Sequence, residues 1–376
     1  MSSIPYGRQS IDEDDIAAVV AALRSDWLTT GPRVAEFEDA IAAVAGAPGA
    51  VAVSNGTAAL HVAYAAAGIG PGDEVIVPTL TFAATATTAL QLGATIRFAD
   101  IQDDTGNIDP ASAAALVGPA TKAVVGVDYA GHPVDADALR DLADRAGALF
   151  IEDAAHSIGS TWRGQPVGSF ADLTTFSFFP TKNLTTAEGG AVVGADPELL
   201  ARARRFRAHG MVRDAASLRE PDVGAWHQEV QEIGLNYRLP DVLCALGTSQ
   251  LTRLAQFKVQ RQRIFDRYVE GLSGVDGIRL PTMRADVEPT WHLFPVRVDA
   301  DRRRQIFDTL RSAGIIVQVN YIPVYWHPLF EDLGYRHGMC PVAEQYYREE
   351  ISLPMYAGLT ESDQDRVIDA VRSALR

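Results

Sequence analysis

Lysine, cysteine and net positive charge are all scarce in this sequence of 376 residues. Lysine and arginine together number 33 against 48 aspartate and glutamate residues, so the formal net charge is −15. A general nucleic-acid-binding protein needs a basic surface, and so does a protein that docks on anionic lipids. The charge balance therefore argues against both classes, and we expect neither a nucleic-acid partner nor a membrane partner.

The low cysteine count argues against two further classes of protein. Cys244 and Cys340 are the only cysteines, which is too few for a disulfide framework or a zinc site. The histidines show no metal-ligand spacing, so we expect no metal. No run of about 18 apolar residues predicts a transmembrane helix. Residues 1–8 have no charged start before an apolar segment, so we expect no secretory signal but a cytoplasmic protein with free thiols.

Short apolar runs are plentiful and alternate with alanine-rich stretches of helical spacing. Hydrophobic residues make up 47% of the chain, as in a globular protein with a large core. Continuous apolar strands with helices between them predict an α/β fold with a mostly parallel sheet, covered on both faces, whose ligands bind at the carboxyl ends of the strands. The expected strands are Ala50–Ser54, Glu74–Val77, Thr95–Phe98, Ala123–Val127, Ala148–Ile151, Leu173–Phe178 and Ala191–Val193.

A second, smaller α/β unit is expected toward the carboxyl end. We therefore predict a large domain over residues 1–245, with an N-terminal helix capped by Ser10, and a small domain over residues 246–376. The boundary lies within or beside a long helix. The elements expected outside the large sheet are helices Ile11–Arg24, Val34–Val44, Val242–Leu272, Arg302–Ala313 and Glu361–Leu375, and strands Trp291–Val298 and Ile315–Val319.

Only three of the basic residues are lysines, so chemistry that depends on lysine has three candidates: Lys122, Lys182 and Lys258. Lys182 follows an apolar strand and precedes small and hydroxyl residues and a Gly-Gly pair. In a mostly apolar setting the pKa of a lysine falls through desolvation, and its neutral amine can form a Schiff base. Taken alone, Lys182 would also suit an ordinary surface loop.

Asp153 follows a buried strand, where a carboxylate is costly without a cationic partner. The protonated ring nitrogen of pyridoxal phosphate (PLP) is such a partner. A metal ion or a helix N-terminus would suit Asp153 equally well.

Three other segments that adjoin strands offer the remaining parts of such a site. Gly56 and Thr57 open a helix, where backbone N–H groups bind anions, although they also suit a plain helix cap. Ser177 could add a hydroxyl to a phosphate. Phe82 could stack on a cofactor ring, or simply belong to the core. Together, anion-binding turn, aromatic ring, aspartate and lysine are what a PLP site needs.

At this point the sequence resembles the fold type I PLP-dependent sugar aminotransferases, the DegT family, over nearly its whole length. The motifs that carry the resemblance are Ile151-Glu152-Asp153-Ala154-Ala155-His156, Ser177-Phe178-Phe179-Pro180-Thr181-Lys182-Asn183, Ala187-Glu188-Gly189-Gly190 and Gly234-Leu235-Asn236-Tyr237-Arg238-Leu239.

The resemblance implies a role for each site residue. Lys182 would form the Schiff base, Asp153 would pair with the ring nitrogen and His156 would lie beside the ring. Gly56, Thr57 and Ser177 would bind the phosphate. Asn236 would reach the neighbouring active site, which implies a homodimer with shared sites.

Within the family, the ends of the chain look like the PseC-type branch. That branch makes UDP-4-amino-4,6-dideoxy-N-acetyl-β-L-altrosamine on the way to pseudaminic acid. The resemblance implies transfer of an amino group from L-glutamate to a UDP-linked 4-keto-6-deoxy sugar. The sugar-nucleotide contacts carried over are Tyr6, Asp26, Trp27, Leu28, Thr29, Gly56, Ser177, Asn236, Gln318, Val319, Asn320 and Tyr321.

Two departures leave the identity of the sugar open. Asn320 stands where the Gln-Val-His-Tyr form of this branch has histidine, and Phe179 stands where a histidine often follows Ser-Phe. A 3-keto or dTDP-linked sugar from an antibiotic or surface-glycan pathway is an alternative substrate. A sugar dehydratase of the same fold would have histidine in place of Lys182. A PLP-binding regulator without catalysis would usually add a DNA-binding module, for which neither the length nor the charge leaves room.

Overall fold

A seven-stranded sheet forms the centre of the molecule in the structure, a computed structural model that describes residues 3–376. Its strand order is β1-β9-β8-β5-β4-β2-β3, and only β9 runs antiparallel to its neighbours. The strands are β1 Gly49–Val53, β2 Glu74–Pro78, β3 Thr95–Ala99, β4 Thr121–Val127, β5 Leu149–Asp153, β8 Leu173–Ser177 and β9 Gly190–Gly194. All seven expected strands and the mostly parallel sheet are confirmed.

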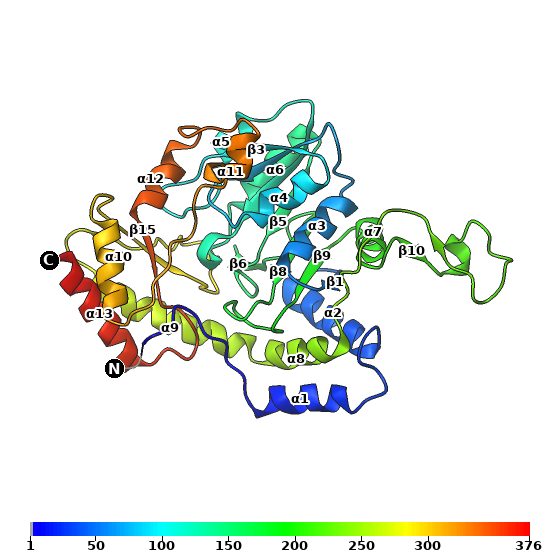
Figure 1. Cartoon of the computed structure of the whole chain (residues 1–376), viewed down its shortest axis with the longest axis horizontal. Helices are drawn as coiled ribbons and strands as arrows, with labels where there is room; N and C mark the ends of the chain where they lie inside the picture. Colours follow the sequence, from blue (N-terminus) through cyan, green and yellow to red (C-terminus); the bar gives the residue numbers. More distant parts are fainter. Residues whose placement is uncertain (1–2) are drawn as a thin grey trace.

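Helices cover both faces of this sheet (Figure 1). On one face α3 and α4 pack against Val75 and Val77, and α7 packs against Val51 and Val192. On the other face α5 and α6 cover Ile76 and Val124. These strands are buried on both faces, which is why they read as continuous apolar runs. The helices are α2 Pro32–Ala45, α3 Gly56–Ala66, α4 Ala84–Gln91, α5 Pro110–Ala114, α6 Ala136–Ala146 and α7 Pro197–Arg207, with a short 3₁₀ helix η1 Tyr129–Gly131.

The carboxyl-terminal part builds a smaller sheet with its own core. The antiparallel strands β12 Ile278–Arg279, β14 Phe294–Val298 and β15 Glu350–Leu353 pack with helices α9 Leu254–Leu272, α10 Arg303–Ser312 and α13 Glu361–Leu375. Ile4 joins this core and pairs with Ile315, so the first described residues run beside the carboxyl-terminal elements. The remaining elements are α8 Asp241–Thr252, α11 Pro328–Asp332, α12 Pro341–Glu349, η3 Val324–Trp326, and the sheet of β13 Val287–Glu288, β6 Thr161–Trp162 and β7 Gln165–Pro166.

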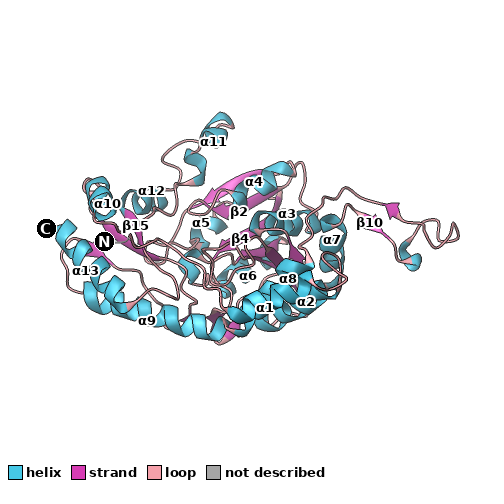
Figure 2. Cartoon of the chain, turned by 60° about the horizontal axis from the view of Figure 1, so that its bottom comes forward, coloured by secondary structure: helices cyan, strands magenta, loops and turns pink. Residues whose placement is uncertain are grey.

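A long arm extends away from this body between α7 and α8 (Figure 2). It contains the hairpin of β10 Met211–Val212 and β11 Glu229–Val230 and the 3₁₀ helix η2 Ala215–Ser217. Trp226 is 80% exposed and Ile233 86% exposed. Large apolar side chains this exposed indicate an interaction surface.

Three expectations for individual elements were wrong. The N-terminal helix α1 spans Glu13–Leu23 and is capped by Asp12, which forms a capping box with Asp15, and not by Ser10. The expected helix 242–272 is interrupted at Arg253, whose backbone leaves the helical region. The expected strand 315–319 forms only isolated bridges, because its backbone bonds go to two separate segments, near Ile4 and Ser352.

The division into domains at residues 245 and 246 stays a prediction. Across residues 3–376, no helix combines the length and apolar character needed to cross a membrane.

Candidate active site

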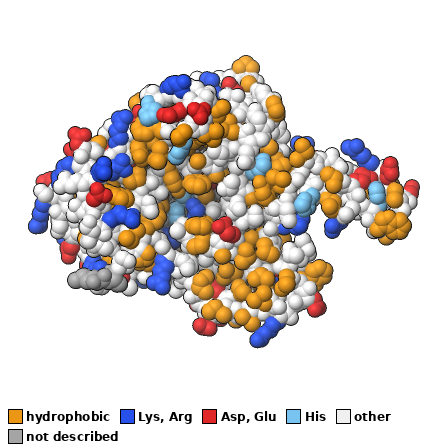
Figure 3. All heavy atoms as spheres, viewed as in Figure 1, with side chains coloured by type: hydrophobic (Ala, Val, Ile, Leu, Met, Phe, Trp, Pro, Cys, Tyr) orange, Lys and Arg blue, Asp and Glu red, His pale blue; other side chains and the backbone are white. Residues whose placement is uncertain are grey.

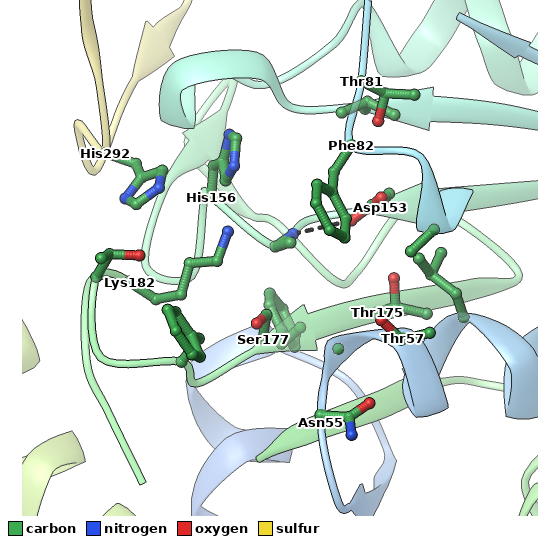
Figure 4. A pocket seen from close by; sticks show the side chains of 18 of the residues that line it. Asn55, Thr57, Thr81, Phe82, Asp153, His156, Thr175, Ser177, Lys182 and His292 are labelled. Carbon is green, nitrogen blue, oxygen red and sulfur yellow. Dashed lines mark hydrogen bonds between the residues drawn. The ribbon is translucent and has the colours of Figure 1, made fainter. Parts of the chain in front are cut away.

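A cavity of about 570 Å³ opens at the carboxyl ends of β1, β2, β5 and β8 (Figure 4). Side chains from strand ends far apart in sequence meet there because parallel strands end at the same edge of the sheet. Of the residues predicted for the cofactor or the substrate, the cavity is lined by Gly56, Thr57, Phe82, Asp153, His156, Ser177, Lys182, Tyr6, Asn320 and Tyr321.

Asp153, the last residue of β5, is buried in the floor of this cavity. Its Oδ2 accepts a hydrogen bond of 2.7 Å from Thr85 Oγ1, and its Oδ1 accepts one of 3.2 Å from the backbone N–H of Ala155. Burial raises the pKa of Asp153, while these two hydrogen bonds and the Lys182 cation act against that rise. A carboxylate that is buried away from water in this way needs a cationic partner.

Lys182 follows β8 in a turn in which its backbone N–H donates to the Phe179 carbonyl at 2.9 Å. The side chain is half-buried, and its amine points into the cavity (Figure 4). Burial lowers the pKa of Lys182 to about 8, although the Asp153 carboxylate acts in the opposite direction. A larger share of the amine is therefore neutral and nucleophilic than in an exposed lysine.

Two buried histidines stand next to Lys182 (Figure 4). The His156 and His292 rings are 4.3 Å apart between centroids, and the Tyr321 hydroxyl lies 3.1 Å from His156 Nε2. Burial, and then the nearby cations, hold the pKa of both histidines well below the usual value, so both rings are neutral. The Nδ1 atom of each ring has no hydrogen-bond partner within the described residues.

The N-terminus of α3 forms a cradle against the end of β8. Asn55 caps the helix by accepting a bond of 2.7 Å from the backbone N–H of Ala58. A Cβ at Gly56 would lie 2.8 Å from the Cβ of Ser177, so only glycine allows this close approach. The backbone N–H groups at the start of α3, beside the hydroxyls of Thr57 and Ser177, suit a phosphate. This cradle and the buried carboxylate of Asp153 fit PLP.

A buried polar network holds the far side of the cavity. The Asn320 side-chain amide donates to the Tyr6 hydroxyl at 2.7 Å and to Ser352 Oγ at 3.0 Å. The Asn320 backbone N–H donates to Glu350 Oε2 at 2.7 Å, and the Tyr129 hydroxyl donates to the Asn320 carbonyl at 2.6 Å. Burial raises the pKa of Glu350 to about 8. The network fixes Tyr6 and the backbone that carries Tyr321.

The model of the DegT/DnrJ/EryC1/StrS aminotransferase family matches residues 9–372 of the chain. The chain belongs to this family. SpsC, a spore coat polysaccharide biosynthesis protein of Bacillus subtilis (strain 168), is 40% identical over 379 residues, covering 99% of this chain and 97% of that protein.

Solved structures agree with this assignment. A Streptococcus pneumoniae protein assigned as a sugar aminotransferase, in its PMP-form, is 32% identical with a TM-score of 0.93, over 99% of this chain and 98% of that chain. PseC of Helicobacter pylori, an aminotransferase involved in the biosynthesis of pseudoaminic acid, is 31% identical with a TM-score of 0.93, over 100% of this chain and 99% of that chain. This DegT-family protein is a PLP-dependent sugar aminotransferase of fold type I.

Several predicted residues of this DegT-family aminotransferase lie outside the cavity. Asp26, Trp27, Leu28 and Thr29 lie in the exposed turn between α1 and α2. Gln318 and Val319 directly precede Asn320. Asn236 lies at the base of the arm, where it forms a β-bridge with Ala208. Their roles, like those of the cavity residues, stay predictions.

The cavity and its immediate surroundings also contain residues that were not predicted as site residues. Thr81 and Glu188 line the cavity, and Thr85 bonds Asp153 directly. His292 also lines the cavity, and its ring is tilted by 40° against that of His156. For Thr85 a signal existed, because it lies three residues after Phe82, one helical turn from a candidate cofactor contact.

Proposed function

We propose that this DegT-family aminotransferase transfers an amino group from L-glutamate to a nucleotide-linked 4-keto-6-deoxy sugar. The proposed nucleotide is UDP, as in pseudaminic acid biosynthesis. The observation that carries the proposal is the half-buried Lys182 in one cavity with the buried Asp153, beside a phosphate cradle. A cavity of about 570 Å³ has the size of an ordinary ligand pocket. The full-length similarity to PseC supports the choice of sugar.

When bound, PLP supplies an electron sink and carries the amino group between the two substrates. The chain's own residues then have separate tasks. Lys182 Nζ, with its pKa lowered to about 8, is the group that would take a proton from the α-carbon of glutamate and, in the second half-reaction, deliver a proton to the sugar carbon that receives the amino group. Asp153 holds the proton of the ring nitrogen in place. Neutral His156, whose Nε2 contacts the Tyr321 hydroxyl, would lie beside the ring without adding positive charge.

Incubation with PLP, L-glutamate and a panel of UDP- and dTDP-linked 3-keto and 4-keto sugars tests this function. We expect an aminated 4-keto-6-deoxy sugar with UDP as the preferred nucleotide, and no product from Lys182→Ala. Preferred turnover of a 3-keto or dTDP-linked sugar would select the alternative substrate. Cofactor binding without turnover of any sugar would favour a regulator and overturn the proposal.

We propose in addition that the enzyme is a homodimer whose arm reaches the neighbouring subunit. Trp226 and Ile233 on the arm are strongly exposed, and Asn236 lies outside the cavity of its own chain. The helix α1 and the turn after it expose a second apolar area, which includes Ile16 and Trp27 (Figure 3). Apolar areas of this kind are typical of subunit interfaces.

Subunit complementation tests whether the active sites are shared. Lys182→Ala and Asn236→Ala subunits are each expected to be inactive as homodimers. If Asn236 serves the neighbouring site, a mixed dimer contains one site with both native residues, so mixing and re-association should restore activity. Activity that stays at the sum of the two inactive variants would contradict shared sites, and a monomer in sedimentation would contradict the dimer.

A further inference from the structure

Two buried threonine hydroxyls stand in line behind Asp153. Thr85, the second residue of α4, has no exposed surface, and its Oγ1 lies 2.7 Å from Asp153 Oδ2. The same Oγ1 lies 2.8 Å from the Oγ1 of Thr81 and 3.1 Å from the Phe82 carbonyl. Thr81 is itself buried and lines the cavity. No task in the reaction described above accounts for either hydroxyl.

Counting protons gives this chain of hydroxyls a direction. Each threonine has one hydroxyl proton, and an ionised carboxylate can only accept. The Thr85 hydroxyl has two acceptors within reach, and the contact to the charged Asp153 is shorter, at 2.7 Å, than the contact to the Phe82 carbonyl, at 3.1 Å, so Thr85 donates to Asp153. In the bond between the two threonines, Thr81 is then the donor and Thr85 the acceptor. This direction of donation, from Thr81 to Thr85 and from Thr85 to Asp153, holds only while Asp153 is ionised. A protonated Asp153 could itself donate its proton to the Thr85 oxygen.

We propose that Thr85, backed by Thr81, is a positioning residue that keeps Asp153 ionised and aimed at the ring nitrogen of the cofactor. This inference rests on the proposed role of Asp153. A hydrogen bond to a charged group in a site with little water is stronger than one between neutral groups. It also fixes one carboxylate oxygen, so that the other oxygen and the remaining lone pairs keep one orientation.

The α4 helix offers a matched control. Thr88 is buried one turn further along, and its hydroxyl donates only to the helix carbonyl of Ala84, at 2.7 Å. Thr85→Val and Thr88→Val therefore make the same chemical change on the same helix at similar burial. Thr85→Ser restores the hydroxyl without the methyl group. The unfolding free energy of each apoenzyme shows whether a variant is folded well enough to compare.

Titration of the apoenzymes with PLP is the main measurement. We expect Thr85→Val to weaken PLP binding by about ten- to a hundredfold, as loss of a hydrogen bond to a charged group does. Thr85→Ser should bind within a few fold of the native enzyme, and Thr88→Val should bind as tightly as the native enzyme. Equal affinities for Thr85→Val and Thr88→Val would overturn the inference.

The pH dependence of binding gives a second readout that a merely structural role would not move. The Thr85 bond lowers the pKa of Asp153, so its loss raises that pKa. The acid limb of PLP affinity should therefore move to higher pH in Thr85→Val and stay in place in Thr88→Val. The titratable groups that face Asp153 are Lys182 after β8, Asp128 after β4, Glu152 on β5, Tyr64 on α3 and Tyr321.

Asp153→Asn separates this inference from the proposed role of Asp153 itself. If Asp153→Asn binds PLP as tightly as the native enzyme, the role of Asp153 is wrong. If Asp153→Asn weakens binding, the double variant with Thr85→Val decides the inference. We expect the double variant to bind like Asp153→Asn alone, since Thr85 acts through Asp153. Fully additive losses would show that Thr85 acts by another route and would overturn the inference.

Discussion

Replacing Gly56 by alanine should remove the phosphate cradle while leaving the fold intact. The new Cβ would lie 2.8 Å from Ser177 Cβ and 2.9 Å from Ser177 Oγ. Carbon atoms in contact need about 3.5 Å, so the Ser177 side chain would have to retreat by about 0.7 Å. The backbone of Ser177 cannot follow easily, since it is paired with Gly190 in the sheet.

The substitution should weaken PLP binding more than it destabilises the fold. A displaced hydroxyl loses a hydrogen bond to a charged phosphate, worth about 1.5–3 kcal/mol, which corresponds to about ten- to a hundredfold in affinity. Alanine is a better helix former than glycine by up to about 1 kcal/mol, which offsets part of the steric cost to stability. We therefore expect weaker PLP binding by Gly56→Ala together with a nearly native unfolding free energy.

Fluorescence or absorbance titration of the apoenzyme with PLP measures the effect. Gly70→Ala is the matched control, because no atom lies within 4 Å of a Cβ built at that glycine. The control should bind PLP like the native enzyme. The phosphate would have to lie elsewhere if Gly56→Ala bound PLP as tightly as Gly70→Ala.

Three further outcomes follow from the site. Because the pKa of Lys182 is about 8, the rate at which the apoenzyme binds PLP covalently should rise about tenfold per pH unit below pH 8 and level off above it. A stopped-flow rate that does not depend on pH would contradict this. The pKa of Glu350, raised to about 8, predicts that stability falls as pH rises from about 4.5 through 8, and that Glu350→Gln flattens this fall in thermal melts. Tyr321→Phe removes the hydroxyl bound to His156 and should lower kcat about tenfold; an unchanged kcat would show that His156 needs no such support.

The large sheet could be predicted because most of its strands are buried on both faces and so appear as apolar runs; the edge strand β3, with Thr95 and Arg97 exposed, is the exception. Where a segment pairs with two separate partners, as around Ile315, the same pattern predicts a strand that does not form. The helix α1 could be predicted, yet two of its apolar side chains, Ile16 and Leu23, are exposed in the single chain. The spacing of apolar residues predicts that one face of a helix is buried, but not whether the same chain or another subunit buries it.

The core of the site could be predicted for a different reason. Asp153 and Lys182 adjoin the carboxyl ends of strands in one parallel sheet, so chain order alone places them at one edge. The bond between Tyr6 and Asn320 joins residues 314 positions apart, and no local pattern predicts such a contact. The Thr85 bond to Asp153 also depends on how α4 packs on the sheet, where it contacts β2 and β3.

Borohydride reduction of the PLP-loaded enzyme, followed by peptide mass spectrometry, tests the central claim most directly. The chain has only three lysines, so the label can appear at only three side chains. Lys182 is the one that lines the cavity, and we expect the reduced cofactor on its peptide alone, with no label in Lys182→Ala. Label on Lys122 or Lys258, or an unlabelled native enzyme, would contradict the assignment of Lys182.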